Sequence, residues 1–464
     1  MLAMLNDLLW GKVLIFVLIP LGLWFTIASG AVQFRYFGHM FAIMGQAFKH
    51  EEGRLSSFQA LTLSVAGRVG GGNIVGVAVA ISLGGPGAIF WMWMVGLIGM
   101  ATSFFECSLA QLYKRQDSEG VFRGGPAYYI EHGLGQRWLA VVFSILLLVT
   151  FGLAFVALQS YVVAGSMQDS LGLPSWASGL LLVTMLGGIV FGGIKRIASV
   201  TEWMVPIMGI GYLLVALLVI GLNFSRVPEM LTLIVQNAFG YGPALGGGVG
   251  AAIILGVKRG LFSNEAGLGS APNVAAVAWV PHPGAQGVVQ AFSVFIDTLL
   301  MCTCTAVIIL LAGLGGDAGN PVALTQNALA FHVGEWGRIF VSIALLLFAF
   351  SSIMYNYYLG ENSINYLGGD SKKQVMVFRA LVLGLVFWGS VQDLGTVFAF
   401  ADLTMGLLAL VNLVAITLLW PVARRLLKDY DSKRREVGGE LVLNPEDFSD
   451  LDIDPQSWPA VSKE

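Results

Sequence analysis

Two glycine-rich segments interrupt apolar stretches of this sequence. Three consecutive glycines weaken a helix, and an unwound backbone has free carbonyls for a hard cation and free amides for a carboxylate. A glycine face for helix packing would be the structural alternative, but such faces use spaced glycines. The first segment therefore predicts a broken helix with a binding role. It reads Ala66-Gly67-Arg68-Val69-Gly70-Gly71-Gly72-Asn73-Ile74-Val75-Gly76.

The second segment is polar as well as glycine-rich. It could separate the two halves of an interrupted helix, or it could be a cytoplasmic loop. If it is a loop, the run from Gly246 to Gly250 would be the break instead. The segment reads Arg259-Gly260-Leu261-Phe262-Ser263-Asn264-Glu265-Ala266-Gly267-Leu268-Gly269-Ser270-Ala271-Pro272-Asn273.

Membrane-spanning helices must hold both segments. Of the 464 residues, 56% are hydrophobic and 11% are charged, whereas about a quarter of the residues of a soluble domain are charged. A run of about 20 apolar residues crosses a bilayer as a helix. The sequence therefore predicts an all-α polytopic protein of the lipid bilayer. We expect about eleven crossings, at 8–32, 58–82, 87–113, 138–166, 176–194, 200–222, 244–280, 287–315, 336–367, 374–391 and 394–421.

Lysine and arginine residues predict the orientation of these crossings, because cytoplasmic loops carry an excess of them. With the N-terminus outside, nineteen cations fall in the cytoplasm and three, Lys12, Arg226 and Arg338, fall outside. We therefore expect a multi-pass protein of the cell (inner or plasma) membrane with a cytoplasmic C-terminus. Residues 422–464 form an acidic tail, and we expect the stretch from Asp429 to Glu464 to be a solvated cytosolic extension.

Composition and residue spacing argue against several classes of function. The net charge of −3 points to no nucleic-acid partner. The five histidines show no metal-ligand spacing and no nucleophile–base pattern, so we do not expect an enzyme. The three cysteines lie inside apolar runs, which predicts core packing rather than disulfides. They are Cys107, Cys302 and Cys304.

At the two glycine-rich segments the sequence resembles the alanine or glycine:cation symporters, transporters of the amino acid–polyamine–organocation type. The run from Gly260 to Pro272 resembles the signature of that family, and the run from Gly72 to Ala78 resembles its first core-helix motif. Further matching motifs lie in order along residues 60 to 415. They are Gly124 to Ile130, Phe295 to Thr298 with Cys302-Thr303, and Ala401-Asp402 with Asn412.

The resemblance implies the leucine-transporter fold and sodium-coupled symport of a small neutral amino acid by alternating access. That fold consists of two inverted repeats, and each repeat contains five helices. The first helix of each repeat is broken. The repeats would be residues 58–222 and 244–421. Residues 1–57 would hold an extra N-terminal helix and a cytoplasmic linker, 223–243 an extracellular connection, and 422–464 the tail.

The resemblance also implies a sodium site. Its ligands would be the carbonyls of Ala66, Val69 and Phe348 and the hydroxyls of Ser351 and Ser352. A sodium ion is satisfied by such oxygens without a carboxylate. Adjacent serines in an apolar helix can also bond back to the preceding turn, which is the structural alternative.

The substrate would lie between the breaks. Its carboxylate would meet the amides of Gly71, Gly72 and Asn73 at a half-helix N-terminus. Gln159, alone in an apolar run, would face the substrate or bond to a neighbouring helix. Ser263 and Asn264 would complete the pocket if the second break is real.

Two departures from the family pattern concern specificity. Many members have a threonine at the position of Gly71 and a tryptophan near Asn356, so this pocket should be larger and more polar. Glutamine or another larger neutral amino acid is therefore an alternative substrate to alanine or glycine. Arg68 could form an ion pair or read a second substrate carboxylate. The candidate ion-pair partners are Glu106, Glu202, Asp297 and Asp402.

Other mechanisms remain open beside sodium symport. The buried carboxylates could carry coupling protons, because burial favours their protonated form. A channel would need a continuous pore ring, whereas broken helices suit alternating access around one site. A sensor would bind an amino acid and sodium yet accumulate nothing.

Overall fold

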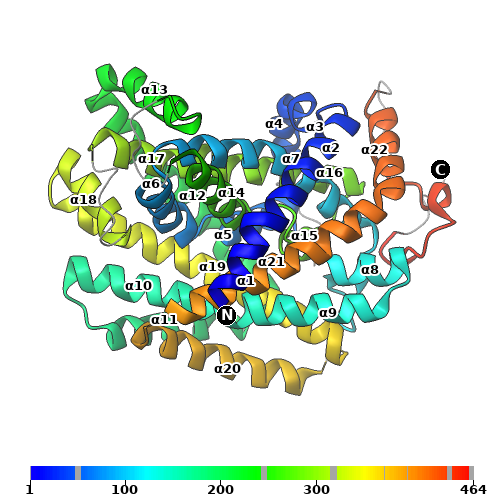
Figure 1. Cartoon of the computed structure of the whole chain (residues 1–464). Helices are drawn as coiled ribbons and strands as arrows, with labels where there is room; N and C mark the ends of the chain where they lie inside the picture. The colour runs from blue at the N-terminus through cyan, green and yellow to red at the C-terminus, as the bar shows by residue number, and fades with distance from the viewer. Residues whose placement is uncertain are drawn as a thin grey trace.

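A computed structural model describes residues 2–46, 54–241, 248–313, 321–369, 371–393, 395–435 and 441–458. Helices make up nearly all of the described chain, and they pack side by side in one body (Figure 1). Among the residues described there is one short antiparallel pair of strands, in which Arg115 pairs with Arg123. The predicted all-α class is therefore confirmed.

The first half of the chain contains the broken helix and the helices around it. Its elements are α1 (Leu2–Leu8), η1 (Leu9–Leu14), α2 (Ile15–Ala28), α3 (Val32–Arg35), α4 (Phe37–Gln46), α5 (Ser57–Arg68), η2 (Gly72–Gly76), α6 (Val77–Gly84), α7 (Gly87–Leu112), β1 (Arg115–Gln116), β2 (Phe122–Arg123), α8 (Pro126–Leu134), α9 (Arg137–Leu147), η3 (Leu148–Phe155), α10 (Val156–Leu171), α11 (Ser175–Val190), α12 (Gly193–Leu222), η4 (Phe224–Arg226) and α13 (Val227–Ala238).

The second half contributes the partners of the broken helix. Its elements are α14 (Gly248–Asn264), α15 (Ala271–Ala275), α16 (Pro283–Val294), η5 (Phe295–Met301), α17 (Cys302–Leu311), α18 (Pro321–Val333), α19 (Trp336–Gly368), α20 (Lys372–Val391), α21 (Gly395–Leu418), α22 (Trp420–Arg435) and η6 (Pro445–Phe448).

Eight helices of the described chain are long and apolar enough to cross a membrane. A ninth span results if α5 and the η2–α6 helix, which meet at 48°, form one bent span. Two further predicted crossings correspond to shorter helices, α11 with 16 residues and α14 with 17. The number of eleven crossings stays a prediction, while a polytopic helical architecture is what the structure has.

The first glycine-rich segment breaks a helix as predicted. Ser56 and Gln59 form a reciprocal capping box at the start of α5. The helix ends at Arg68, since Val69 has left helical geometry with φ −80° and ψ 82°. A π-helical turn from Gly72 to Gly76 then starts the second half in a new direction.

The helix α14 ends inside the second segment, and after six residues the five-residue helix α15 follows. After α14 ends at Asn264, the backbone is left-handed at Glu265, Gly267 and Gly269, with φ of 55°, 85° and 80°. Such angles are incompatible with an α-helix. In the alternative location, Gly248 to Gly250 lie in the first turn of α14, and Gly246 and Gly247 lie outside the described residues.

The tail is docked on the body, so the prediction of a solvated extension is wrong for its described part. Leu443, Phe448 and Trp458 are buried, and the Trp458 indole donates to the carbonyl of Leu112 at 3.1 Å. Asp452 pairs with His132 of α8 at 2.7 Å. Figure 1 shows this red segment beside α8 and α22. Spaced apolar side chains bury themselves, while the acidic residues between them meet basic ones.

Candidate functional site

A small cavity lies where the broken helix meets its neighbours. In this structure only about 10 Å³ of it is open to a water-sized molecule. Seven elements, α5, η2, η3, α10, α14, α19 and α21, and the junctions at Gly70 and Glu265 supply the lining, which mixes backbone, aromatic rings and polar side chains, as ligand pockets do. The lining residues are Gly67, Arg68, Gly70, Gly72, Phe151, Phe155, Gln159, Phe262, Glu265, Asn356 and Met405.

Three of the predicted substrate residues, Gly72, Gln159 and Asn356, line this cavity. Gly71 does not line the cavity itself. Its N–H donates to Oε1 of Gln159, which does line it, at 3.3 Å. Asn356 is buried, and within the described residues its carboxamide makes no hydrogen bond. A buried amide without a protein partner is costly, so this group is available to a ligand.

The other three predicted substrate residues do not line the cavity. The Asn73 carboxamide accepts from the N–H of Gly70 at 2.9 Å and donates to Oδ1 of Asp297 at 2.6 Å. Ser263 donates to Oδ2 of Asp297 at 3.0 Å. The carbonyl of Asn264 accepts from Nε of Arg68 at 2.6 Å. These contacts join the two breaks to each other and to η5.

Two acidic residues at the site were absent from the predicted binding set. Asp297 gathers Asn73, Ser263 and Thr298 around its carboxylate. Glu265 lines the cavity itself. Both are carboxylates placed among apolar or glycine-rich residues, and an intramembrane carboxylate is by default a functional candidate. That signal was present in the sequence.

Arg68 is held by hydrogen bonds rather than by an ion pair. Its guanidinium donates to the carbonyl of Asn264, to the hydroxyls of Ser103 and Ser293, and to the side chain and carbonyl of Gln290. The four carboxylates considered as its partners contact other groups. They are Glu106 with the N–H of Gly267, Glu202 with Gln59, Asp297 with Asn73, and Asp402 with Lys258 at 2.5 Å.

Four of the five predicted sodium ligands form one cluster of oxygens. Ser351 Oγ donates to the carbonyls of Ala66 at 3.1 Å and Phe348 at 2.8 Å. Ser352 Oγ lies 3.0 Å and 3.1 Å from the same two oxygens. The serine hydroxyls therefore reach across to α5 as well as back to the preceding turn. Val69, the fifth, caps α5 and is buried.

The chemistry of this cluster fits sodium. Two carbonyls and two hydroxyls form a set of neutral oxygens without nitrogen or sulfur, as a hard monovalent cation requires. The close approach of α5 to α19 depends on glycine. A Cβ at Gly70 would lie 2.2 Å from Ser352 Oγ, and one at Gly67 would lie 2.5 Å from the Tyr355 ring.

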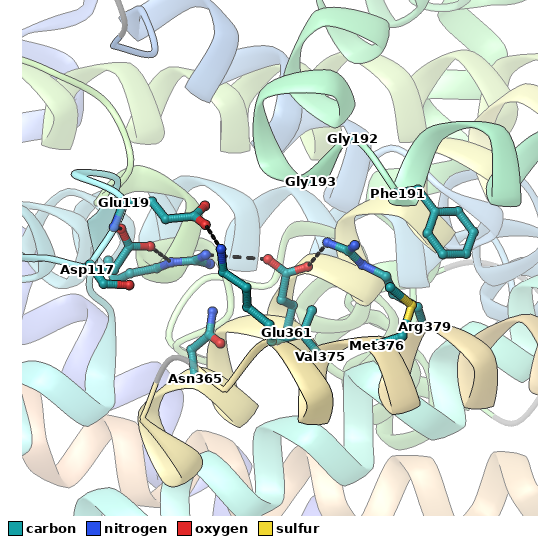
Figure 2. Close-up of a pocket in the computed structure, with 13 residues that line it drawn as sticks. Asp117, Glu119, Phe191, Gly192, Gly193, Glu361, Asn365, Val375, Met376 and Arg379 are labelled. Atoms are coloured by element: carbon teal, nitrogen blue, oxygen red, sulfur yellow. Dashed lines mark hydrogen bonds and ion pairs between the residues drawn. The ribbon is translucent and has the colours of Figure 1, made fainter.

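A second, charged cavity joins the hairpin of β1 and β2 to α19 and α20 (Figure 2). Its charges pair with one another. Arg123 bonds to Asp117 at 3.0 Å and to Glu361 at 3.4 Å, and Arg379 approaches Glu361 at 3.7 Å. Figure 2 shows the Arg379 side chain pointing toward Glu361, with Asp117 on the other side of Glu361. This network connects structural elements.

Comparison with known proteins shows the family of this chain. Residues 1–442 match the profile of the Sodium:alanine symporter family. The chain is 47% identical over 431 residues to the amino-acid carrier protein AlsT of Bacillus subtilis, covering 93% of this chain and 92% of that one. It is 46% identical to the probable sodium/glutamine symporter GlnT of the same organism, covering 94% and 91%.

The fold also has a solved counterpart. The structure of MhsT in complex with L-phenylalanine superposes with a TM-score of 0.58 at 14% identity, covering 80% of this chain and 90% of that one. At this identity the likeness concerns the fold alone, and it confirms the predicted fold class. With a family match over nearly the whole length, the chain is a membrane transporter rather than an enzyme, and it belongs to the sodium:alanine symporter family.

Proposed function

We propose that this protein uses a sodium gradient to carry a neutral amino acid into the cell by alternating access. The observation that carries the proposal is the pairing of two sites on one broken helix. The cavity lies on α5 and the turn after it, and the oxygen cluster joins α5 to α19. An ion and a substrate that share one mobile helix can each favour the same conformation, which is the basis of coupling.

Sodium would bind between Ala66, Phe348, Ser351 and Ser352, with the carbonyl of Val69 as a fifth oxygen. In the structure both hydroxyls donate their protons to carbonyls of this set. A cation would make the hydroxyl oxygens ligands and turn those protons away. When bound, sodium supplies attraction between α5 and α19, and the protein supplies the oxygens.

The substrate would occupy this cavity in a conformation in which it is wider, since only about 10 Å³ is open to a water-sized molecule here. Its carboxylate would meet the amides of Gly71 and Gly72, and Gln159 would border it. Asn356 would meet its side chain. Asn73, Ser263 and Asn264 would serve the substrate by holding the two breaks in place. Alanine and glycine fit the family, and glutamine is supported by the free carboxamide of Asn356 and by the name of the relative GlnT.

Uptake into proteoliposomes tests this function. Labelled glycine, alanine, glutamine and glutamate would be offered with an inward sodium gradient and then with a proton gradient. We expect accumulation of a neutral amino acid with sodium. Accumulation driven by protons alone, or of glutamate, would contradict the proposal. Counterflow is the control, since a carrier exchanges labelled for unlabelled substrate and a channel does not.

We further propose that the N-terminus lies outside and the C-terminus in the cytoplasm of the plasma membrane. The excess of lysine and arginine on one side of the predicted crossings supports this orientation. In this proposal residues 58–222 and 244–421 form the two repeats, which lie in the membrane with opposite orientations. Single cysteines at Ser225 and Ser432 can be labelled with an impermeant reagent in whole cells. Labelling of position 432 but not 225 would contradict the orientation.

A further inference from the structure

Glu265 stands out in the cavity, because it is a buried carboxylate on an unusual backbone. It lies directly after α14, it is 5% exposed, and it lines the cavity. Its φ of 55° is left-handed, a conformation that costs free energy for a residue with a side chain. The turn between α14 and α15 bears this cost and directs the carboxylate into the cavity.

Only one oxygen of this carboxylate is engaged by the protein. Oε2 accepts from the hydroxyl of Ser270 at 2.5 Å and from that of Tyr355 at 2.8 Å. Within the described residues, no hydrogen bond or ion pair involves Oε1. The two hydroxyls hold the carboxylate in place and leave its second oxygen open.

The carboxylate also lacks a bonded counter-ion. Arg68 shares the cavity, but its guanidinium is bonded to Asn264, Ser103, Gln290 and Ser293. The ion pairs of the described residues do not include Glu265. A buried carboxylate without a paired cation is destabilising, so such a group usually has a partner that completes it.

We infer that Glu265 binds the ammonium group of the transported amino acid through its open oxygen. This inference rests on the proposed function. It names the residue that binds the ammonium group, while the glycine amides bind the carboxylate. The amides of Gly71 and Gly72 suit an anion, and Glu265 on the other broken helix suits a cation. A zwitterion then bridges the two breaks. Sodium is the other possible cation, but its neutral oxygen cluster lies between α5 and α19.

This role has a selectivity consequence. L-lactate differs from L-alanine in having a hydroxyl in place of the ammonium. Both groups can donate a hydrogen bond to a carboxylate, but only the ammonium also brings a positive charge that forms an ion pair with it. The wild-type protein therefore binds alanine at least a hundredfold more tightly than lactate, and L-glutamine more tightly than its 2-hydroxy analogue by a similar factor.

The experiment measures binding of both pairs to the full-length protein in saturating sodium. Glu265→Gln keeps the shape of the side chain and removes its charge. We expect amino-acid affinity to fall ten- to a hundredfold, while affinity for the hydroxy analogues stays the same or rises. Glu265→Asp, which keeps the charge, retains part of the discrimination. Glu361→Gln, a buried carboxylate outside the cavity, is the matched control and leaves the ratio unchanged.

Several results would overturn the inference. An unchanged ratio in Glu265→Gln would do so, as would a wild-type ratio near one, which needs no variant. Loss of proton dependence with an intact ratio would make Glu265 a proton carrier instead. A shift in sodium affinity with an intact ratio would make it a sodium ligand. Failure of the wild type to accumulate any amino acid would instead contradict the proposed function itself.

Discussion

The side-chain nitrogen of Asn73 lies 2.6 Å from Oδ1 of Asp297. This bond ties the first broken helix to η5, in the second half of the chain. The same side chain accepts from the N–H of Gly70 at 2.9 Å, across the three-glycine run. Asn73 thus holds the shape of the break, and it acts on the cavity through the glycines beside it.

Replacing Asn73 by alanine should abolish uptake. The change removes one of several hydrogen bonds to the buried Asp297 carboxylate and the side-chain acceptor of the Gly70 N–H, at a cost of about 0.5–3 kcal/mol for each bond. Uptake into proteoliposomes measures the effect. Asn223→Ala is the control, because Asn223 bonds to the preceding turn of α12 and to His332, away from both breaks. Full activity of Asn73→Ala would remove the first break from the working site.

The double variant Ser351→Ala with Ser352→Ala should raise the sodium concentration needed for half-maximal uptake at least tenfold. It removes two of the proposed sodium oxygens, and a loss of about 1.4 kcal/mol already corresponds to a factor of ten. Uptake measured against sodium concentration shows the effect. Ser363→Ala removes a hydroxyl that bonds only to the preceding turn of the same helix, and it should change nothing. Unchanged sodium dependence in the double variant would place the cation elsewhere.

Asn356→Trp should narrow the substrate range to small side chains. The indole takes up space in the cavity, so glutamine uptake should fall more than tenfold while glycine or alanine uptake persists. Competition of unlabelled amino acids against a labelled one measures the range. Asn356→Leu is the matched control, since it keeps the size and removes only the carboxamide. A range that stays the same in the tryptophan variant would refute the assignment of Asn356 to the side-chain end of the pocket.

Docking of α22 should weaken as the pH falls below 6.5. Burial lowers the pKa of His282 from its ordinary value of 6.5. In the docked state Nδ1 accepts from the N–H of Gly284, and Nε2 lies 2.9 Å from Asp429. A proton on Nδ1 would break the first bond. Because the docked histidine resists a proton that the undocked one takes up, its contribution is present above pH 6.5 and is lost below it.

Hydrogen exchange of residues 420–435 at pH 7.5 and 5.5 measures this docking. Burial alone would raise the pKa of Asp429, but hydrogen bonds from His282 and Lys433 lower it below 3.8, so this carboxylate stays charged over the whole range. His282→Asn keeps a helix-capping side chain and removes the titration. Equal pH dependence in wild type and variant would show that His282 is not the sensor.

The break after α5 could be predicted because it is local. A run of glycines in an apolar stretch weakens a helix wherever the chain folds. The bond between Asn73 and Asp297 joins residues 224 positions apart, and no local pattern indicates that the Asn73 side chain turns toward η5 rather than the cavity. The serine pair is similar, since its reach from α19 to Ala66 followed from family resemblance rather than from spacing.

The docked tail could not be predicted from local sequence. Leu443, Phe448 and Trp458 are separated by acidic and polar residues, so their average hydropathy resembles that of a solvated segment. Their burial depends on surfaces supplied by α7, α8 and α22. Likewise, the sequence alone does not show that Glu265 lacks a bonded counter-ion, because this depends on which groups Arg68 contacts in the fold.

The contact between Gly71 and Gln159 bears on how such transporters diverge. A Cβ at position 71 would lie 2.9 Å from Oε1 of Gln159, which is the movable end of a flexible side chain. A threonine there would push this glutamine into another rotamer. We therefore expect the residues at positions 71 and 159 to change together during evolution. A homologue that acquires threonine at position 71 also acquires a cavity of different shape, because Gln159 lines that cavity. Substrate preference can therefore change through a substitution at one codon.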